Sequence, residues 1–183
     1  MITDFNNILK LIKNNKFDEA IKNLNELTKK NKNNFDYYYL KGISYLNLNE
    51  FAKAVENFSL AIGINENNFI VYHFRGISYL KLNMVDKAKN DFNKLISLKT
   101  DFPEVYNNLG YLLYANGENE LAIKNFIKSI KLNKNHKLAI SSLINALSHT
   151  KNVEINNSEI IATHNQLNKV NFYYSPIEYI EDN

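Results

Sequence analysis

The chain has 183 residues, of which 45% are hydrophobic and 22% are charged, a composition typical of a folded protein rather than a disordered one. It contains no cysteine, which excludes disulfide bonds, thiolate metal sites and thiol catalysis. The formal net charge is only +3, and Arg75 is the single arginine. Because base reading and phosphate clamping favour arginine, we expect no nucleic-acid partner.

The start of the chain does not have the order of a signal peptide, because Asp4 comes early and polar residues interrupt its apolar run. No apolar run in the sequence approaches the length that spans a bilayer. We therefore expect a cytoplasmic protein that has no membrane partner.

A 34-residue period organises the chain from its start to residue 136. Gly42, Gly76 and Gly110 share one phase of this period, and Ile8 stands at the same place in the first unit. Four further columns keep the period: Leu11, Tyr45, Tyr79 and Leu113; Ala20, Ala54, Ala88 and Ala122; Leu24, Phe58, Phe92 and Phe126; Leu27, Ala61, Leu95 and Ser129. An uninterrupted period of this length predicts a solenoid of stacked repeats.

The first unit, residues 1–34, opens with an irregular helix and continues with a regular one, predicted from Phe17 to Lys30. The apolar residues of the second helix recur at the spacing of one helical face. A terminal unit has one exposed side, so we expect it to be atypical and to cap the stack.

Each of the next three units, residues 35–68, 69–102 and 103–136, is predicted to form two helices joined by a short polar turn. The predicted helices are Phe35–Leu48 and Phe51–Ile64, Phe69–Leu82 and Val85–Leu98, and Pro103–Ala115 and Asn119–Leu132. The turns, Asn49-Glu50, Asn83-Met84 and Asn116-Gly117-Glu118, contain residues that tolerate a left-handed backbone. Asp101 is expected to cap the helix that begins at Pro103, with Glu104 three residues after the cap.

The small residues at fixed phase predict that the two helices of a unit cross closely. A glycine inside a helix costs about 1 kcal/mol relative to alanine, so three of them at one phase need a compensating contact. We expect Gly42, Gly76 and Gly110 to leave room for the second helix, and the alanine column to do the same from the other side.

The period, the Gly-x-x-Tyr/Leu pattern and the Ala-x-x-x-Phe/Leu pattern together resemble the tetratricopeptide repeat. The resemblance covers residues 1–136 and extends through a fifth first helix, Lys137–His149. Two family positions differ: tyrosine replaces tryptophan at Tyr38, Tyr72 and Tyr106, and the proline near each unit's end is replaced by Lys32, Glu66, Thr100 and Lys134. The resemblance implies an all-α, right-handed α-solenoid of antiparallel helix pairs, with about four and a half repeats followed by a C-terminal helix and tail.

Residues 150–183 leave the repeat pattern. A polar linker, Lys151–Asn157, precedes a helix that Ser158 could cap, and Pro176 interrupts an aromatic stretch after it. Three interpretations stay open. The segment covers the end of the last repeat, or its aromatic residues dock into the array's concave face, or it leads into a further domain, as in some bacterial repeat–glycosyltransferase fusions.

Catalytic patterns are missing from the sequence. His73, His136, His149 and His164 are not paired at metal-ligand spacing, and no zinc-protease, nucleophile-elbow or phosphate-loop motif occurs. We expect no catalytic site, metal or cofactor, and therefore not an enzyme.

The resemblance implies a concave groove lined by one face of each first helix. The groove positions are Tyr39, Ile43, His73, Ile77, Asn107, Tyr111 and Tyr114, with Leu46 and Leu80 expected to pack between units. Family members that clamp a C-terminal carboxylate use lysine and asparagine here, so Tyr39, Ile43 and Ile77 predict an extended or helical segment held by apolar anchors instead.

The predicted function is that of a protein–protein interaction scaffold that binds a peptide or protein segment in this groove. An apolar groove and tail could also support self-association. The alternative is the recruiting N-terminal arm of a larger or truncated enzyme, such as a repeat-fused glycosyltransferase, and the reading frame after Asn183 would distinguish the two.

Overall fold

The structure is a computed structural model, and it describes residues 5–149. Within that range the chain forms nine α-helices and no strand, which confirms the predicted all-α class. The helices are α1 (Phe5–Lys13), α2 (Phe17–Lys30), α3 (Phe35–Asn47), α4 (Phe51–Ile64), α5 (Phe69–Lys81), α6 (Val85–Leu98), α7 (Pro103–Ala115), α8 (Asn119–Leu132) and α9 (Lys137–His149). The linker, helix and aromatic stretch predicted after His149 lie outside the described residues.

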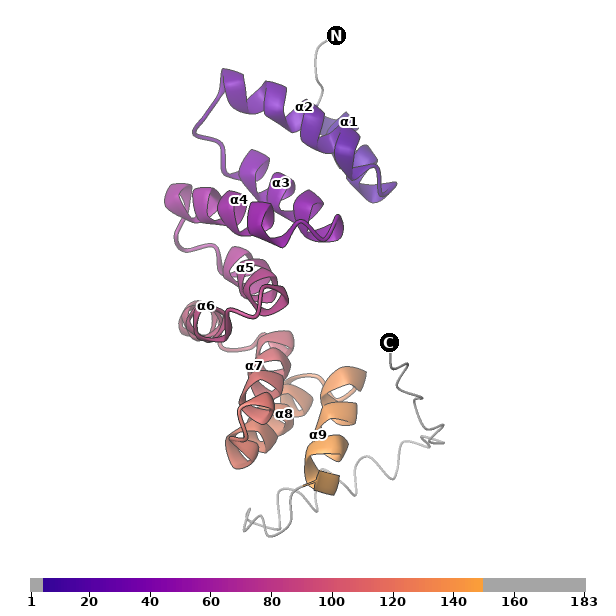
Figure 1. Ribbon diagram of the computed structural model, residues 1–183, viewed down its shortest axis with the longest axis vertical. Helices are drawn as coiled ribbons and strands as arrows, with labels where there is room; N and C mark the ends of the chain where they lie inside the picture. The colour runs from indigo at the N-terminus through magenta and orange to yellow at the C-terminus, as the bar shows by residue number, and fades with distance from the viewer. Residues whose placement is uncertain (1–4, 150–183) are drawn as a thin grey trace.

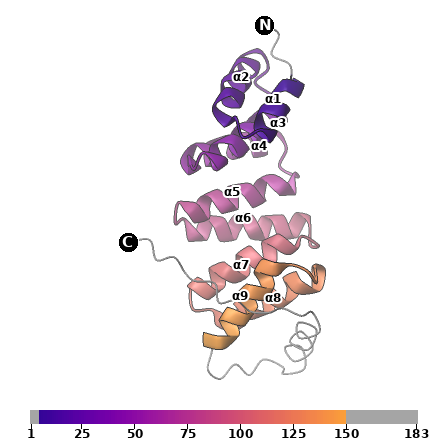
Figure 2. The same cartoon turned by 90° about the vertical axis from the view of Figure 1, so that its right-hand side faces the viewer.

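The helices form antiparallel pairs that stack along the long axis of the molecule, with α1 and α2 at one end and α9 at the other (Figures 1 and 2). In the three later pairs the two helices pack most extensively on each other, and each second helix also packs on the first helix of the next pair. The predicted bounds of all four second helices, of α7 and of α9 are confirmed. Helices α3 and α5 end one residue before the predicted Leu48 and Leu82.

The crossing inside each later pair depends on a glycine and a phenylalanine. A Cβ atom added to Gly42 would lie 2.5 Å from the ring of Phe58, and one added to Gly76 would lie 2.5 Å from the ring of Phe92. Gly110 repeats the arrangement, with 2.6 Å to the ring of Phe126. All three rings are buried. The missing side chain therefore makes the space that the ring fills, which is the compensating contact predicted for these glycines.

The first pair reaches the same packing with different side chains. Ile8 and Leu24 stand where the later pairs have glycine and phenylalanine, and both are fully buried in one cluster with Ala20. A larger residue on the first helix thus accompanies a smaller one on the second, so the core stays filled.

The turn inside each pair has one conformation throughout the array. Asn15, Asn49 and Asn83 have φ values of 58°, 59° and 57°, and Gly117 has a φ of 79°. The following N–H group donates to the carbonyl five residues earlier, for example Glu50 to Tyr45 at 2.9 Å and Met84 to Tyr79 at 2.8 Å. This is the Schellman motif, which satisfies the last carbonyl groups of the first helix. The predicted left-handed turns are confirmed.

The helix starts follow the repeat rather than the local pattern at Asp101. The side chain of Asn34 accepts a hydrogen bond from the N–H of Tyr37, and that of Asn68 accepts one from Ile70, so both cap their helices. The predicted cap at Asp101 is wrong: the 34-residue period puts the cap of α7 at Phe102, which offers no oxygen. Asp101 lies one residue too early and pairs with Lys99 at 3.4 Å.

The single arginine joins three helices from inside the stack. The Arg75 guanidinium on α5 donates two hydrogen bonds to Asp91 on α6, at 2.8 and 2.7 Å, and one to the hydroxyl of Ser59 on α4, at 3.0 Å. Its carbon also lies 5.6 and 5.7 Å from the ring centroids of Tyr72 and Tyr79. Burial opposes the charge, but the hydrogen bonds and attraction of Asp91 raise the pKa of Arg75 above its ordinary value. The group ties the second unit to the third.

The glycine contact predicts a stability change. Gly76→Leu places a side chain where the buried ring of Phe92 lies, so overpacking is expected to lower the free energy of unfolding by about 1–3 kcal/mol in urea titrations. Gly63→Ala is the control, because no atom lies within 4 Å of the added Cβ and alanine is the better helix former. Equal stability of Gly76→Leu and the wild type would contradict the packing described here.

The arginine network predicts a second change. Asp91→Asn leaves a mostly buried guanidinium without its counter-charge, so we expect a loss of roughly 3 kcal/mol in the free energy of unfolding. Glu26→Gln, which breaks the exposed pair with Lys29, should change it far less, because solvent screens that pair. Similar effects of the two substitutions would show that the Arg75–Asp91 pair has no special structural role.

Candidate binding surface

Six of the seven predicted groove residues, all but Tyr114, fall into two rows that cross the first helices. Row one consists of Phe5, Tyr39, His73 and Asn107, and row two of Leu9, Ile43, Ile77 and Tyr111. Within each helix the two rows are four residues apart, about one turn, so they share one face of α1, α3, α5 and α7. We call the two rows together the first-helix face. Phe5 and Leu9 were not among the predicted residues, although the 34-residue period could have identified both.

Tyr39 of row one belongs to the packing between the second and third units. Its ring stacks on Phe35 with centroids 5.8 Å apart and an interplanar angle of 11°. It also lies 6.1 Å from the ring of Phe74 on the next first helix and 6.3 Å from that of Phe58. Burial raises the pKa of the Tyr39 hydroxyl above its ordinary value. Tyr39 therefore supports the face and contributes only part of its side chain to the surface.

His73 is more deeply buried than the groove prediction implied, with 7% of its surface exposed. Its ring meets the edge of Phe102 at 5.0 Å and 89°, and lies 5.2 Å from Phe74. Nδ1 makes no hydrogen bond within the described part of the chain. Burial lowers the pKa of His73 to about 4, an effect that the charge of Glu104 partly offsets. The imidazole is thus neutral at pH 7.

Asn107 repeats this burial one unit later. Only 8% of its surface is exposed, and its Oδ1 atom is buried without a hydrogen bond from the described residues. Row one thus has a packed ring at Tyr39 and polar side chains that are mostly covered at His73 and Asn107. It forms the floor of the first-helix face rather than its accessible part.

Row two is more open than row one. Tyr111 is 61% exposed and Leu9 is 42% exposed, whereas Ile43 and Ile77 are half-buried. Ile43 packs against the core around Phe58 more than we expected from the sequence. Row two therefore presents an apolar or aromatic side chain in each of four successive units.

The remaining predicted positions pack into the cores. Leu46 lies against the cluster that joins α4 to Val71, and Leu80 against the cluster that includes Val105 of the next unit, as expected for residues between units. Tyr114 is half-buried against the cluster formed by α7, α8 and α9. These three residues border the first-helix face without extending it far.

One serine–histidine pair has the distance of a catalytic pair but not its chemistry. The Ser129 hydroxyl donates to the carbonyl of Pro103 at 2.7 Å and lies 2.7 Å from Nδ1 of His136. We infer that Nδ1 carries the proton and donates to Ser129, because the serine proton is already used. Ser129 is fully buried, so the pair joins α8 to the start of α9 instead of activating a nucleophile.

Residues 5–149 contain no group of three or more histidine or acidic side chains that could hold a metal ion. None of the helices in this range is both long and apolar enough to cross a bilayer.

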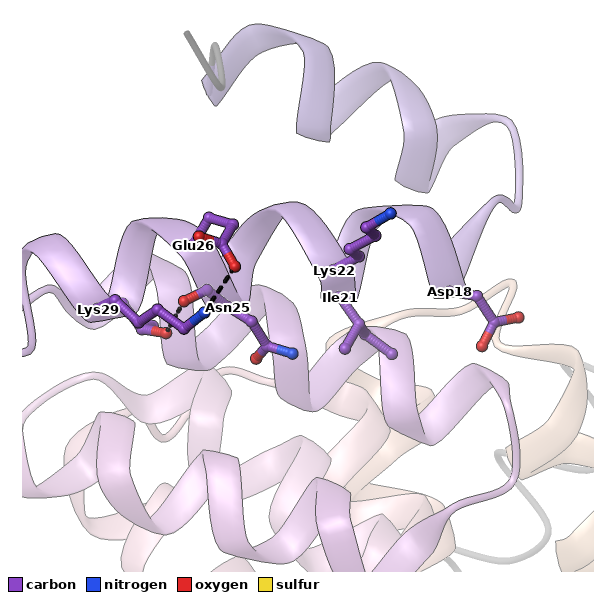
Figure 3. Close-up of a pocket in the computed structure, with 7 residues that line it drawn as sticks. Asp18, Ile21, Lys22, Asn25, Glu26 and Lys29 are labelled. Atoms are coloured by element: carbon purple, nitrogen blue, oxygen red, sulfur yellow. Dashed lines mark hydrogen bonds and ion pairs between the residues drawn. The ribbon is translucent and has the colours of Figure 1, made fainter. Parts of the chain in front are cut away.

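A surface pocket lies along α2, on the second-helix side of the array (Figure 3). It is lined by Asp18, Ile21, Lys22, Asn25, Glu26, Thr28 and Lys29. All of these come from one helix, and Figure 3 shows them spread along it rather than converging on one point. Lys29 pairs with Glu26 at 2.7 Å, and the Thr28 hydroxyl donates to the carbonyl of Asn25. The pocket offers no convergent polar groups for a ligand, and we assign no site to it.

The burial of His73 predicts a pH effect on stability. The pKa is about 4 in the folded chain and 6.5 in the unfolded reference, so only the unfolded state gains a proton as the pH falls between these values. The free energy of unfolding should therefore fall from pH 6.5 towards pH 4, by up to about 3 kcal/mol from this residue. In urea titrations at several pH values, His73→Phe should remove this component, while His149→Gln, at an exposed residue, should keep it. An unchanged pH profile in His73→Phe would contradict the assignment.

Comparison with known proteins agrees with this geometry. Models of the tetratricopeptide repeat match residues 7–68, 70–102 and 103–136. No curated protein sequence matches the chain.

Solved structures share the fold. The crystal structure of MamA superposes with a TM-score of 0.77 at 20% identity and covers 93% of this chain and 95% of its own. MamA from Desulfovibrio magneticus RS-1 gives 0.75 at 19% identity, with 90% and 89% covered. The first repeat domain of Spaghetti, bound to the HSP90 peptide SRMEEVD, gives 0.60 at 19% identity and covers 62% of this chain and 90% of its own. The helix pairs, the glycine–phenylalanine crossing and the matched models show that this chain belongs to the tetratricopeptide repeat family.

Proposed function

We propose that the chain is a non-catalytic interaction module that binds an extended or helical protein segment across the first-helix face. The observation that carries the proposal is row two, which keeps an apolar or aromatic residue in four successive units and ends in Tyr111, 61% exposed. Tyr111 has no place in the described core clusters, so its large ring is not explained by stability. Exposed tyrosines with aliphatic neighbours are typical anchors of protein interfaces.

The chemistry of the face indicates how a partner is held. The Spaghetti domain is bound to an acidic peptide, whereas rows one and two of this chain contain no lysine or arginine. A partner is therefore held here by burial of apolar side chains rather than by clamping of a carboxylate. Burial of one large apolar side chain contributes about 1.5–3 kcal/mol, so two or three such anchors together contribute several kcal/mol to the free energy of binding.

The face also has a direction. Along row two the residues change from Ile43 and Ile77 through Tyr111 to the exposed Asn145 at the matching place on α9. The accessible part of the face is thus apolar or aromatic up to α7 and polar at the α9 end. We propose a partner segment with its apolar anchors at α3–α7 and a polar continuation towards α9.

The experiment is a capture assay with matched surface variants. With the full chain as bait, the double variant Ile77→Glu and Tyr111→Glu should lose the partner that the wild type retains, identified by mass spectrometry, because two carboxylates replace apolar anchors. The control double variant is Leu60→Glu and Leu121→Glu, which changes side chains 46% and 47% exposed on the second helices α4 and α8. Circular dichroism should show the same helix content in all three proteins. Capture that survives in the row-two variant would exclude the first-helix face.

A further inference from the structure

We infer that the chain's own aromatic C-terminal segment, residues 172–179, occupies the first-helix face until a partner displaces it. The inference rests on the proposed function, because it assigns a competitor to the same surface. The segment is separated from the described residues by 22 residues and contains five large apolar side chains within eight residues: Phe172, Tyr173, Tyr174, Ile177 and Tyr179. Leaving such side chains in water forgoes about 1.5–3 kcal/mol each, so a nearby apolar surface is a favourable place for them.

The two surfaces match in chemical type. The first-helix face contributes aliphatic and aromatic groups from Ile43, Ile77 and Tyr111, with aromatic side chains packed behind them. Aromatic rings of the segment can add to this packing in tilted or stacked pairs, worth about 0.5–1.5 kcal/mol beyond the buried area. Pro176 restricts the segment's backbone and lowers the entropy lost when it is held in one conformation.

The charges of the two parts are opposite in sign. Residues 1–149 contain 20 basic and 14 acidic side chains, whereas residues 150–183 contain two basic and five acidic ones. Three of the acidic residues, Glu178, Glu181 and Asp182, lie within or directly after the aromatic segment. On α5 the exposed Lys81 lies one turn beyond Ile77, on the same side of the helix. Glu104, in contrast, lies at the start of α7, so the acidic end of the segment is expected near Lys81 and away from Glu104.

The linker is long enough to reach the face. The 22 residues 150–171 can span at most roughly 75 Å when fully extended, which sets the upper limit of their reach. Packed helices lie about 8–10 Å apart, and α9 contacts α7, so α7 and α5 are within roughly 10–30 Å of the linker's start. Because the segment and the face belong to one chain, their contact is intramolecular, and weaker contacts suffice than between separate molecules.

The α9 end of the described array does not compete for the same residues. Leu138 on α9 is exposed, and the residues that directly follow His149 are the nearest ones in sequence to cover that end. The aromatic segment begins 22 positions later, so covering the end leaves residues 172–179 available for the first-helix face.

The absence of cysteine allows a direct test on the full chain. A nitroxide spin label is attached at Ser175→Cys, and methyl signals are recorded before and after reduction of the label. We expect loss of signal at Ile43 and Ile77, and none at Leu60 and Leu121 on the second helices. The matched control carries the same label together with Phe172→Ser, Tyr174→Ser and Ile177→Ser, and it should restore the signals of Ile43 and Ile77.

Three results would overturn the inference. The first is no signal loss on the first-helix face, and the second is loss confined to α9, for example at Ile144. The third is loss that appears only between a spin-labelled chain and a separate isotope-labelled chain, which would show that a second copy is the occupant. The capture assay with Ile77→Glu and Tyr111→Glu decides the proposed function separately, so capture that depends on the face without any signal loss would reject only the present inference.

Discussion

The contact between a helix glycine and the phenylalanine ring of the following helix sets the geometry of the three later helix pairs. Each of the three glycines costs about 1 kcal/mol of helix stability relative to alanine. The ring that the glycine admits is fully or almost fully buried, and burying a phenylalanine contributes about 1.5–3 kcal/mol, so the pair is favourable as a unit. Because Gly42, Gly76 and Gly110 have the same phase, the three later helix pairs cross in the same way. A constant crossing makes the pairs stack in register.

The left-handed turn fixes how the chain passes from the first helix of each pair to the second. The same Schellman hydrogen bond closes α1, α3, α5 and α7, and its acceptors are the carbonyls of Leu11, Tyr45, Tyr79 and Leu113. These residues belong to the column that follows the glycine by three positions, so crossing and turn are set within a few residues of each other. With both fixed, every first helix shows the same face to one side of the stack. The register of rows one and two is therefore a consequence of backbone geometry rather than of the side chains in the rows.

The sequence allows the prediction of whatever recurs with the period, and much less of what occurs once. The bounds of α2 to α9, the turns and the glycine crossing recur, and the bounds of these helices could be predicted to within one residue, whereas α1 was predicted only as an irregular helix. The cap at Asp101 failed because a local Asp–Pro–Glu pattern was weighed above the column that contains Asn34 and Asn68. The Arg75–Asp91 pair occurs in one unit and joins residues 16 positions apart, so no helical spacing or repeat pointed to it.

The same distinction applies to the candidate surface. Its residues could be predicted from the family pattern, but their burial depends on contacts between units. Phe102, the residue that precedes α7, covers His73 from 29 positions along the chain, and no single-helix pattern contains that contact. Leu9 was missed because the first unit was treated as a cap, although its place in the period matches Ile43 and Ile77.

The two rows have separate physical roles, and this separation makes the fold suitable for recognition. Row one is largely covered, and its buried polar atoms at His73 and Asn107 make substitutions there affect stability first. Row two lies further out, and it differs between units while the buried Ala20, Ala54, Ala88 and Ala122 column does not. A change in row two therefore alters what the surface binds without altering how the helices cross. Because a partner contacts several units at once, its specificity follows from the order of row-two side chains along the stack, which in this chain runs from aliphatic to an exposed tyrosine.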